Sequence, residues 1–446
     1  MPTYKTPNVY VEEISTFPPS VAEVSTAIPT FIGTTEKAQR GSEDLTNKPT
    51  RISTLLDYET QFGGAEAAKF DVRVDSEDQI TSISSADSKN LMYYALRLYF
   101  DNGGGSCYVV SVGNYSKAAT KNDFQAGLDA LEKEDEPTLI LLTDAIELPS
   151  DQYYELCQAA LMQCNKLKDR FVIFDVLSTD TNGSDFRQNI GTESLKYGAA
   201  YYPYIQTSLS YHYTDESVTV GTGKNSPQLG HQSIVIQKNA LYHQIKSELD
   251  KQQVVLPPSA AVAGVYARVD RDRGVWKAPA NVSLLSVLAP TVKINNEEQE
   301  NFNIDPTAGK SINLIRSFTG KGTLVWGART LAGNDNEWRY IPVRRLFNLI
   351  EESLQKAIAF FIFESNNAIT WLKVKSVAEN YLDGLWRQGA LAGTTEEQAY
   401  FVNIGLGKSM TTQDILEGRM IVEVGIAAVR PAEFIVLKFS HKLQES

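Results

Sequence analysis

Two aspartates follow short apolar runs and are the residues best placed to do chemistry. Asp144 comes two positions after the run at residues 139–142, and Asp175 comes directly after the run at residues 171–174. If both runs are strands of a parallel sheet, the two carboxylates lie at its carboxyl edge, where open α/β folds bind ligands. Such a pair could hold a metal ion or act as general acid and base. Aspartate in this position also commonly caps the helix or turn that follows a strand.

The other chemical motifs in the sequence are incomplete. The glycines at 103–105 precede an expected strand, whereas a phosphate-binding loop follows a strand and opens a helix. Residues 309–311 read Gly-Lys-Ser like the end of a Walker loop, but Ile304 stands where its first glycine belongs. The four histidines lack metal-ligand spacing. We therefore expect no catalytic residue, cofactor or metal site; the alternative is a soluble α/β enzyme that uses Asp144 and Asp175.

The elements that would position these aspartates alternate along the chain. Segments with helical spacing of apolar residues alternate with short continuous apolar runs. The expected helices are 91–100, 124–131 and 151–167, and the expected strands are 21–34, 107–112, 139–142, 171–174 and 197–205. Strands that are apolar on both faces and separated by helices indicate a covered, mostly parallel sheet. We predict an α/β domain over residues 21–300, with a surface loop at 64–90 and an insertion at 210–256.

The last third of the chain has a different pattern. Residues 343–362 and 369–386 carry apolar stripes at helical spacing, which predicts two amphipathic helices. Residues 420–429 and 434–439 are apolar runs that we expect to be strands joined by a proline-containing turn. This order predicts a smaller C-terminal α+β domain over residues 301–430.

Both ends of the chain carry strand-like segments without an evident partner. Residues 1–20 contain four prolines, which predicts an extended N-terminal arm, and residues 431–446 form a C-terminal arm. A strand at a chain end presents unpaired N–H and C=O groups. Each arm either folds back on its own domain or completes a sheet in a neighbouring subunit, which would make a polymer. The residues expected to pair are Val9, Tyr10, Val11, Ile14, Glu433, Phe434, Ile435, Val436, Leu437 and Phe439.

Composition excludes some classes of partner. The net charge of −12 argues against nucleic acid, because phosphate binding needs clustered lysine and arginine. No apolar run approaches the ~20 residues that a membrane span requires, and the N-terminus lacks a signal-peptide pattern. The three cysteines form no Cys-x-x-Cys pair and suit a reduced compartment. We expect synthesis and assembly in the cytoplasm, without direct membrane insertion.

Two groups of basic residues interrupt the acidic composition. They are Arg268, Arg271, Arg273 and Lys277 at an expected helix end, and Arg329, Arg339, Arg344 and Arg345 around the long C-terminal helix. Each group either pairs with carboxylates of its own chain or forms a patch that docks a partner.

Six segments, in order along the chain, resemble the contractile tail sheath family of phage tails, tailocins and extracellular contractile injection systems. They are residues 6–14 (TPNVYVEEI), 258–267 (PSAAVAGVYA), 273–281 (RGVWKAPAN), 322–331 (GTLVWGARTL), 338–346 (WRYIPVRRL) and 430–435 (RPAEFI). Asn8 stands where the family usually has glycine, although asparagine tolerates unusual backbone angles. Residues 40–90 and 210–256 carry no such match.

The resemblance implies a structural subunit. Such sheaths are helical polymers of stacked rings around a rigid inner tube, and their arms pair with a sheet in the C-terminal domain of adjacent subunits. They assemble in an extended state on a baseplate, then contract and drive the tube through a target envelope. The implied partners are further copies of the chain, a tube protein, baseplate and terminal cap proteins, and paralogous sheath subunits. The implied location is a phage tail or tail-like particle, extracellular after lysis, with Arg339, Arg344 and Arg345 as candidate contacts to the tube or another subunit.

Overall fold

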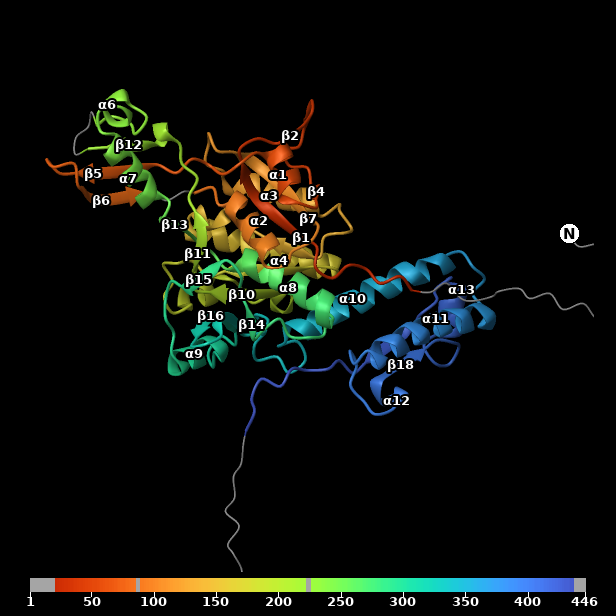
Figure 1. Ribbon diagram of the computed structural model, residues 1–446. Coiled ribbons are helices and arrows are strands. Elements are labelled where there is room, and N and C mark those ends of the chain that lie inside the picture. The colour runs from red at the N-terminus through yellow and green to blue at the C-terminus, as the bar shows by residue number, and fades with distance from the viewer. Residues whose placement is uncertain (1–20, 86–88, 222–225, 437–446) are drawn as a thin grey trace, which may run out of the picture. The chain divides into compact units, whose positions relative to one another are not determined.

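The computed structural model describes residues 21–85, 89–221 and 226–436, which fall into two units (Figure 1). The larger unit comprises the described residues of 25–349 together with residues 430–436. The smaller unit comprises residues 21–24 together with residues 350–429. Among the described residues, no helix has both the length and the apolar character needed to cross a membrane.

A nine-stranded sheet forms the centre of the larger unit, in the order β14-β17-β16-β10-β9-β8-β1-β7-β4. In chain order the strands are β1 (Pro29–Thr35), β4 (Thr50–Ile52), β7 (Cys107–Asn114), β8 (Leu139–Leu141), β9 (Phe171–Asp175), β10 (Gly198–Tyr202), β14 (Val282–Ser283), β16 (Ile312–Phe318) and β17 (Gly322–Trp326). Every pairing from β7 across to β16 is parallel, whereas β4, β17 and β14 pair antiparallel at the two edges. The predicted covered, mostly parallel sheet is therefore confirmed.

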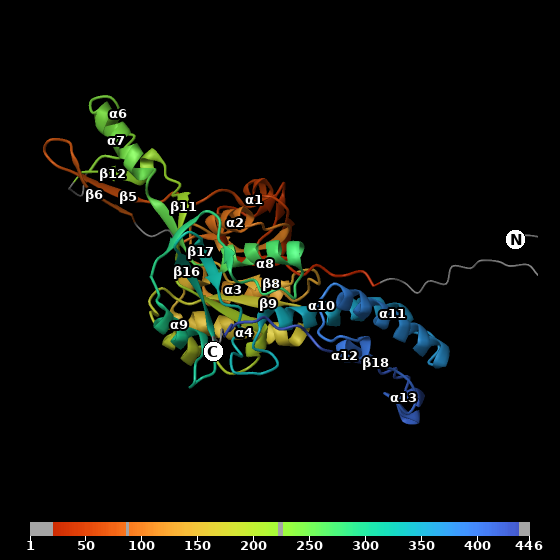
Figure 2. The same cartoon turned by 60° about the horizontal axis from the view of Figure 1, so that its bottom comes forward.

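Helices cover both faces of this sheet. They include α2 (Met92–Asp101), α3 (Lys121–Leu131), α4 (Ser150–Leu167) and α8 (Ser259–Arg273). Alternate residues of each strand enter different cores: Phe31 packs with α2 and α8, whereas Ile32 packs with α3 and α4. Figure 2 shows α8 and α4 on opposite sides of β8 and β9. This two-sided burial explains why these strands are continuous apolar runs in the sequence.

A further core of the larger unit lies where the sequence predicted a surface loop and an insertion. Its elements are β5 (Phe70–Val74), β6 (Ile80–Ser85), β12 (Val218–Val220), α6 (Gln232–Val235) and α7 (Asn239–Leu249). Phe70 and Val72 are buried against Val218 and Ile245, and β12 pairs parallel with β5. The prediction of a loop over residues 64–90 was therefore wrong. The alternation Phe70, Val72, Val74 is short, and its partner strand lies far away in the sequence.

The remaining elements of the larger unit lie outside the nine-stranded sheet and its covering helices. β11 (Ile205–Ser210) pairs antiparallel with β13 (Gln253–Leu256) and β15 (Val287–Pro290). The others are β2 (Gln39–Arg40), β3 (Glu43–Asp44), α1 (Leu55–Phe62), α5 (Ser184–Asn189) and α9 (Asn296–Asn303). Of these, β11, β13 and α1 contribute buried side chains to the same core as Phe31.

The smaller unit is an α+β assembly. It receives the last turns of α10 (Ile341–Ile358) and contains α11 (Ala368–Arg387), α12 (Glu396–Ala399), β18 (Tyr400–Asn403), α13 (Thr412–Leu416) and β19 (Glu423–Ile426). Its core includes Phe361, Val374, Val377 and Met410, and Val21 packs against it. We placed the boundary between the two domains after residue 300, whereas these units divide after residue 349 because β16 and β17 belong to the large sheet.

Candidate functional site

Asp144 is a buried cap that joins a strand to a helix. It accepts hydrogen bonds from the backbone N–H of Thr34 at 2.7 Å and of Leu91 at 2.8 Å. Thr34 lies near the end of β1, and Leu91 directly precedes α2. Burial raises the pKa of the Asp144 carboxyl to about 6, although the hydrogen bonds from Thr34 and Leu91 oppose that shift. The carboxylate thus satisfies backbone donors that would otherwise be orphaned.

Asp175 has the same role on the next part of the sheet. It ends β9 and accepts a hydrogen bond from the N–H of Ser259, the first residue of α8, at 2.8 Å. Burial raises the pKa of Asp175 to about 7, and the hydrogen bonds from Ser259 oppose the shift. The sequence is compatible with a catalytic pair or with two caps, and the hydrogen bonds support caps. The enzyme alternative is not favoured.

Arg345 forms a buried clamp on the segment that follows the N-terminal arm. Its Nη1 donates to Asp270 Oδ1 at 3.0 Å, and its Nη2 donates to the backbone carbonyl of Thr26 at 2.8 Å. The Thr26 hydroxyl donates to Asp270 Oδ2 at 2.6 Å and closes the network. The guanidinium also lies 4.6 Å from the ring centre of Tyr266. We call these three residues, Thr26, Asp270 and Arg345, the N-terminal clamp.

Arg329 forms a second clamp at the start of the C-terminal arm. Its Nε and Nη2 donate to the two carboxylate oxygens of Glu433 at 2.9 and 2.7 Å. Asn303 Nδ2 at 2.8 Å and the Tyr340 hydroxyl at 3.1 Å donate to the same carboxylate. Burial acts to raise the pKa of Glu433, but the hydrogen bonds from Arg329 and Asn303 outweigh it and the net pKa is lowered. We call Asn303, Arg329, Tyr340 and Glu433 the C-terminal clamp.

Arg344 and Arg339 have different surroundings. Arg344 is 2% exposed, lies 4.4 Å from the ring centre of Trp338 and donates to Asn348 at 2.8 Å. Arg339 is partly exposed and donates to the backbone carbonyl of Asp335 at 3.1 Å. In this conformation the guanidinium groups of Arg344 and Arg345 are buried by their own chain, so they present no surface to a partner. Their assignment as contacts to a tube or another subunit stays a prediction, and only Arg339 has the exposure for it.

The arm residues fall partly outside the described residues: this holds for Val9, Tyr10, Val11, Ile14, Leu437 and Phe439. Of the described C-terminal arm, Phe434, Ile435 and Val436 are 66–80% exposed and form no strand. The sheet of the smaller unit has two strands, because within the described ranges β18 and β19 pair only with each other. A strand needs a neighbour, and the described arm has none in the single chain.

Sequence reasoning found the arginines but missed most of their partners. Thr26, Asp270 and Asn303 lie outside the segments that resemble the sheath family, and Asp270 is 75 positions from Arg345. The usable signal was that each arginine stands inside a segment resembling the sheath family.

Comparison with known proteins agrees with this fold and these segments. The profile of the phage tail sheath protein central domain matches residues 117–331, and that of the phage tail sheath C-terminal domain matches residues 333–442. The helical sheath of the anti-feeding prophage in its contracted state contains a chain with 34% identity and a TM-score of 0.68, covering 99% of this chain and 100% of that chain. The contracted sheath complex of PVC, an extracellular contractile injection system, contains one with 31% identity and a TM-score of 0.68, covering 99% of both.

Curated relatives match over shorter stretches. The tail sheath protein of Enterobacteria phage T4 is 27% identical over 145 residues, which is 31% of this chain and 21% of that protein. A putative prophage major tail sheath protein of Pseudomonas aeruginosa is 26% identical over 141 residues, or 30% of this chain and 34% of that protein. The matched stretch thus spans between a fifth and about a third of these relatives. With the full-length structural matches, the chain belongs to the contractile tail sheath family.

Proposed function

We propose that this chain is the structural subunit of a contractile sheath, which polymerises helically around an inner tube and contracts to drive the tube through a target envelope. The observation that carries the proposal is the full-length similarity to chains of two contracted sheaths, at 31% and 34% identity. The chain would have no catalysis of its own, and Asp144 and Asp175 would serve as helix caps.

The arms are proposed to pair with the smaller unit of neighbouring subunits. The two-stranded sheet of β18 and β19 supports this, because its outer edges pair with no other strand among the described residues and could each accept one. The exposed side chains of Phe434, Ile435 and Val436 supply an apolar strand. Six residues of strand span roughly 20 Å, and strand addition takes affinity from backbone hydrogen bonds and specificity from alternate side chains. Residues 1–20 and 431–446 would be the linking arms, outside an α/β domain and a C-terminal α+β domain.

The proposed partners follow from the same reading. They are further copies of the chain, an inner tube protein, baseplate and terminal cap proteins, and paralogous sheath subunits. One matching chain comes from the anti-feeding prophage baseplate, with 34% identity and a TM-score of 0.68, which supports association with a baseplate. The location would be a phage tail or a phage tail-like particle.

Electron microscopy of the purified protein tests the proposal. We expect rods or tubes, and deletion of residues 1–14 or 432–446 should leave a folded subunit that makes no long polymers. Truncation after Val436 is the matched variant, because it shortens the C-terminal arm and keeps the C-terminal clamp. Monodisperse small particles from the intact chain would contradict the sheath. Normal tubes after both arm deletions would contradict strand exchange.

A further inference from the structure

We propose that the two clamps, the buried N-terminal one and the partly buried C-terminal one, are the anchors that transmit force between the arms and the body of the subunit. This inference rests on the proposed function, because it concerns arms that are held by neighbouring subunits. The inference adds specific residues to the proposed function: the Arg345–Asp270–Thr26 network at the N-terminal arm, and the Arg329–Glu433 pair at the C-terminal arm.

Both clamps lie where the chain passes between its two units. The chain leaves the smaller unit after Val24, and Thr26 is bonded within the larger unit two positions later. It returns to the larger unit at Arg430, and Glu433 is bonded there three positions later. The third passage lies within α10, which also carries Arg345. Each covalent passage is therefore fixed to the larger unit within a few residues.

The chemistry of the clamps suits an anchor. A bidentate arginine–carboxylate pair fixes both distance and orientation. The side chains of Arg345 and Asp270 are 3% and 5% exposed, so water cannot readily replace either partner. Removing one partner of a buried pair is costly because it leaves the other charge uncompensated. By contrast, Arg387 and Asp383 form an ion pair on α11 with 75% and 27% exposure, and such surface pairs contribute little.

Without the clamps, tension on an arm would be borne by residues that contribute little packing. The described C-terminal arm beyond Glu433 consists of Phe434, Ile435 and Val436, whose side chains are largely exposed. A pull on this segment would peel the chain back toward the smaller unit. With Glu433 held by Arg329, Asn303 and Tyr340, the pull is transferred to β17 and its surroundings in the large sheet. The subunits can then repack while their connections stay in place.

The experiment compares three variants of the full-length chain: Glu433→Gln, Tyr340→Phe and the control Asp383→Asn. Glu433→Gln removes the charge and keeps the shape, and Tyr340→Phe removes one hydrogen bond. The first readout is hydrogen exchange of residues 430–436 in the unassembled subunit. We expect exchange to accelerate on the order of tenfold in Glu433→Gln, less in Tyr340→Phe, and not in the control.

The second readout is the length distribution of polymers before and after shear. We expect Glu433→Gln polymers to break into shorter pieces than wild type, Tyr340→Phe to lie between them, and Asp383→Asn to match wild type. Polymers of Glu433→Gln that survive shear like wild type would overturn the proposal, whether or not exchange accelerates. If Glu433→Gln does not fold, Tyr340→Phe decides by the same criterion.

The N-terminal clamp provides an independent second test. Asp270→Asn should accelerate exchange at residues 25–28 and weaken the polymer under shear, and Thr26→Val should do so more mildly because only the hydroxyl is lost. If the wild-type chain forms no polymer, the proposed function fails, whereas the exchange results still measure the clamps. If wild-type polymers form and neither clamp alters their strength, the anchor fails and the sheath function stands.

Discussion

The large sheet and the two-stranded sheet of the smaller unit differ in how far their strands are paired and buried by their own chain. Every residue of β1 is buried, and β1 pairs with β7 on one side and β8 on the other. β18 pairs only with β19 in the described structure, and its Phe401 is 54% exposed. The inner strands of the first sheet are paired on both sides within the subunit, so that sheet supplies stability. The second leaves strand edges and apolar surface open, so it is suited to receive other chains.

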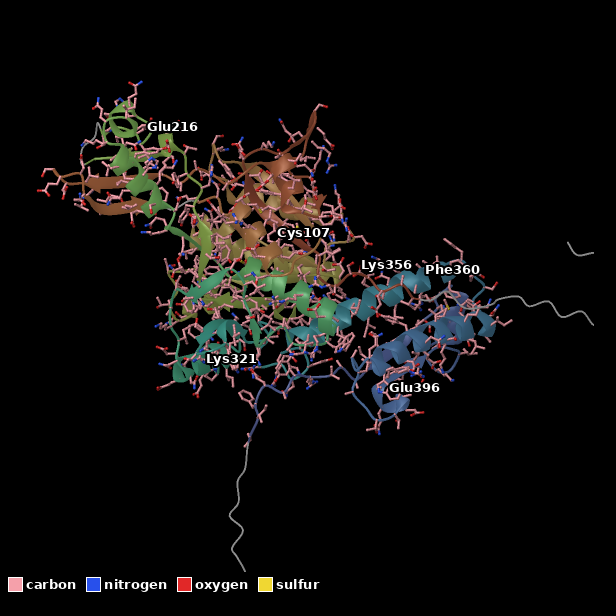
Figure 3. All side chains as sticks on the ribbon, viewed as in Figure 1. Cys107, Glu216, Lys321, Lys356, Phe360 and Glu396 are labelled. Carbon is pink, nitrogen blue, oxygen red and sulfur yellow. The ribbon has the colours of Figure 1, made fainter. Side chains whose placement is uncertain are left out.

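Exposed side chains reinforce the contrast. Cys107 and Phe360, both labelled in Figure 3, represent the two regions: Cys107 in β7 is fully buried, whereas Phe360 just after α10 is 72% exposed. The large exposed apolar residues of the smaller unit are Phe360, Ile362, Phe363, Ile369, Leu372, Phe401, Leu406 and Leu416. The larger unit also exposes large apolar residues, but they are spread over a much longer stretch of chain, and dense exposed apolar surface is typical of interaction sites. The smaller unit is therefore where we expect assembly to be encoded.

The largest expected effect comes from replacing a phenylalanine by alanine in each of the two regions. Phe31→Ala removes a fully buried ring of β1 that packs 5.2 Å from the ring of Tyr99, and should lower the free energy of unfolding by about 3–5 kcal/mol. Phe363→Ala removes a fully exposed ring and should leave subunit stability unchanged while shortening polymers. Denaturant unfolding and electron microscopy measure the two properties. Equal losses of stability from both variants would contradict the contrast.

The sequence predicted the large sheet well because its strands are buried on both faces. β8 and β9 are continuous apolar runs in the sequence, so they can be predicted as strands without knowing which strands pair with them. β5 was not predicted because its partner strand β12 and the helices α6 and α7 of its core come from a distant segment of the chain.

The clamps were only half predictable. Arg329 and Arg345 stand out as positive charges, but nothing local in the sequence indicates Asp270 or Glu433 as their partners. The open edge of β19 is likewise a property of the folded chain, since a strand pattern does not show whether both edges are paired.

The two caps of the large sheet predict a pH dependence that the smaller unit lacks. Asp144 and Asp175 have pKa values raised by burial to about 6 and about 7, above the 3.8 of a free aspartate. The folded state keeps its protons longer than the unfolded state, so stability falls as pH rises from about 4 to about 7. In the smaller unit, Asp414 has a pKa lowered by hydrogen bonds from Thr411, which gives the opposite sign.

Asp144→Asn should therefore flatten the pH dependence of stability. The raised pKa corresponds to a loss on the order of 3 kcal/mol between about pH 4 and about pH 7, and the variant should lack it. The comparison uses the pH slope, because the asparagine amide also faces a backbone donor and shifts stability at every pH. Thermal unfolding at about pH 4 and about pH 7 measures the slope for both proteins. Parallel slopes would show that Asp144 titrates normally.

Two glycine-to-alanine substitutions should have opposite effects on the free energy of unfolding. A Cβ at Gly33 would lie 2.5 Å from Asp144 Oδ2, a carboxylate fixed by hydrogen bonds, so Gly33→Ala should cost about 1–3 kcal/mol. A Cβ at Gly384 in α11 would meet no atom within 4 Å. Gly384→Ala should therefore stabilise the smaller unit by about 0.5–1 kcal/mol, because alanine favours the helix. Urea unfolding of each variant gives the sign of the change in the free energy of unfolding. A stabilising effect of Gly33→Ala would show that the Asp144 carboxylate is not fixed in position.

The smallest effect concerns whether the two units unfold separately. Thr54 caps α1 in the larger unit and Thr411 caps α13 in the smaller unit, each through the same capping box with an aspartate three positions later. Loss of either cap should cost about 1 kcal/mol. If the units unfold separately, Thr54→Ala should accelerate hydrogen exchange in the larger unit alone, and Thr411→Ala in the smaller unit alone. Exchange that accelerates across both units after either change would mean that they unfold as one, and the smaller unit would then owe its stability to the large sheet as well.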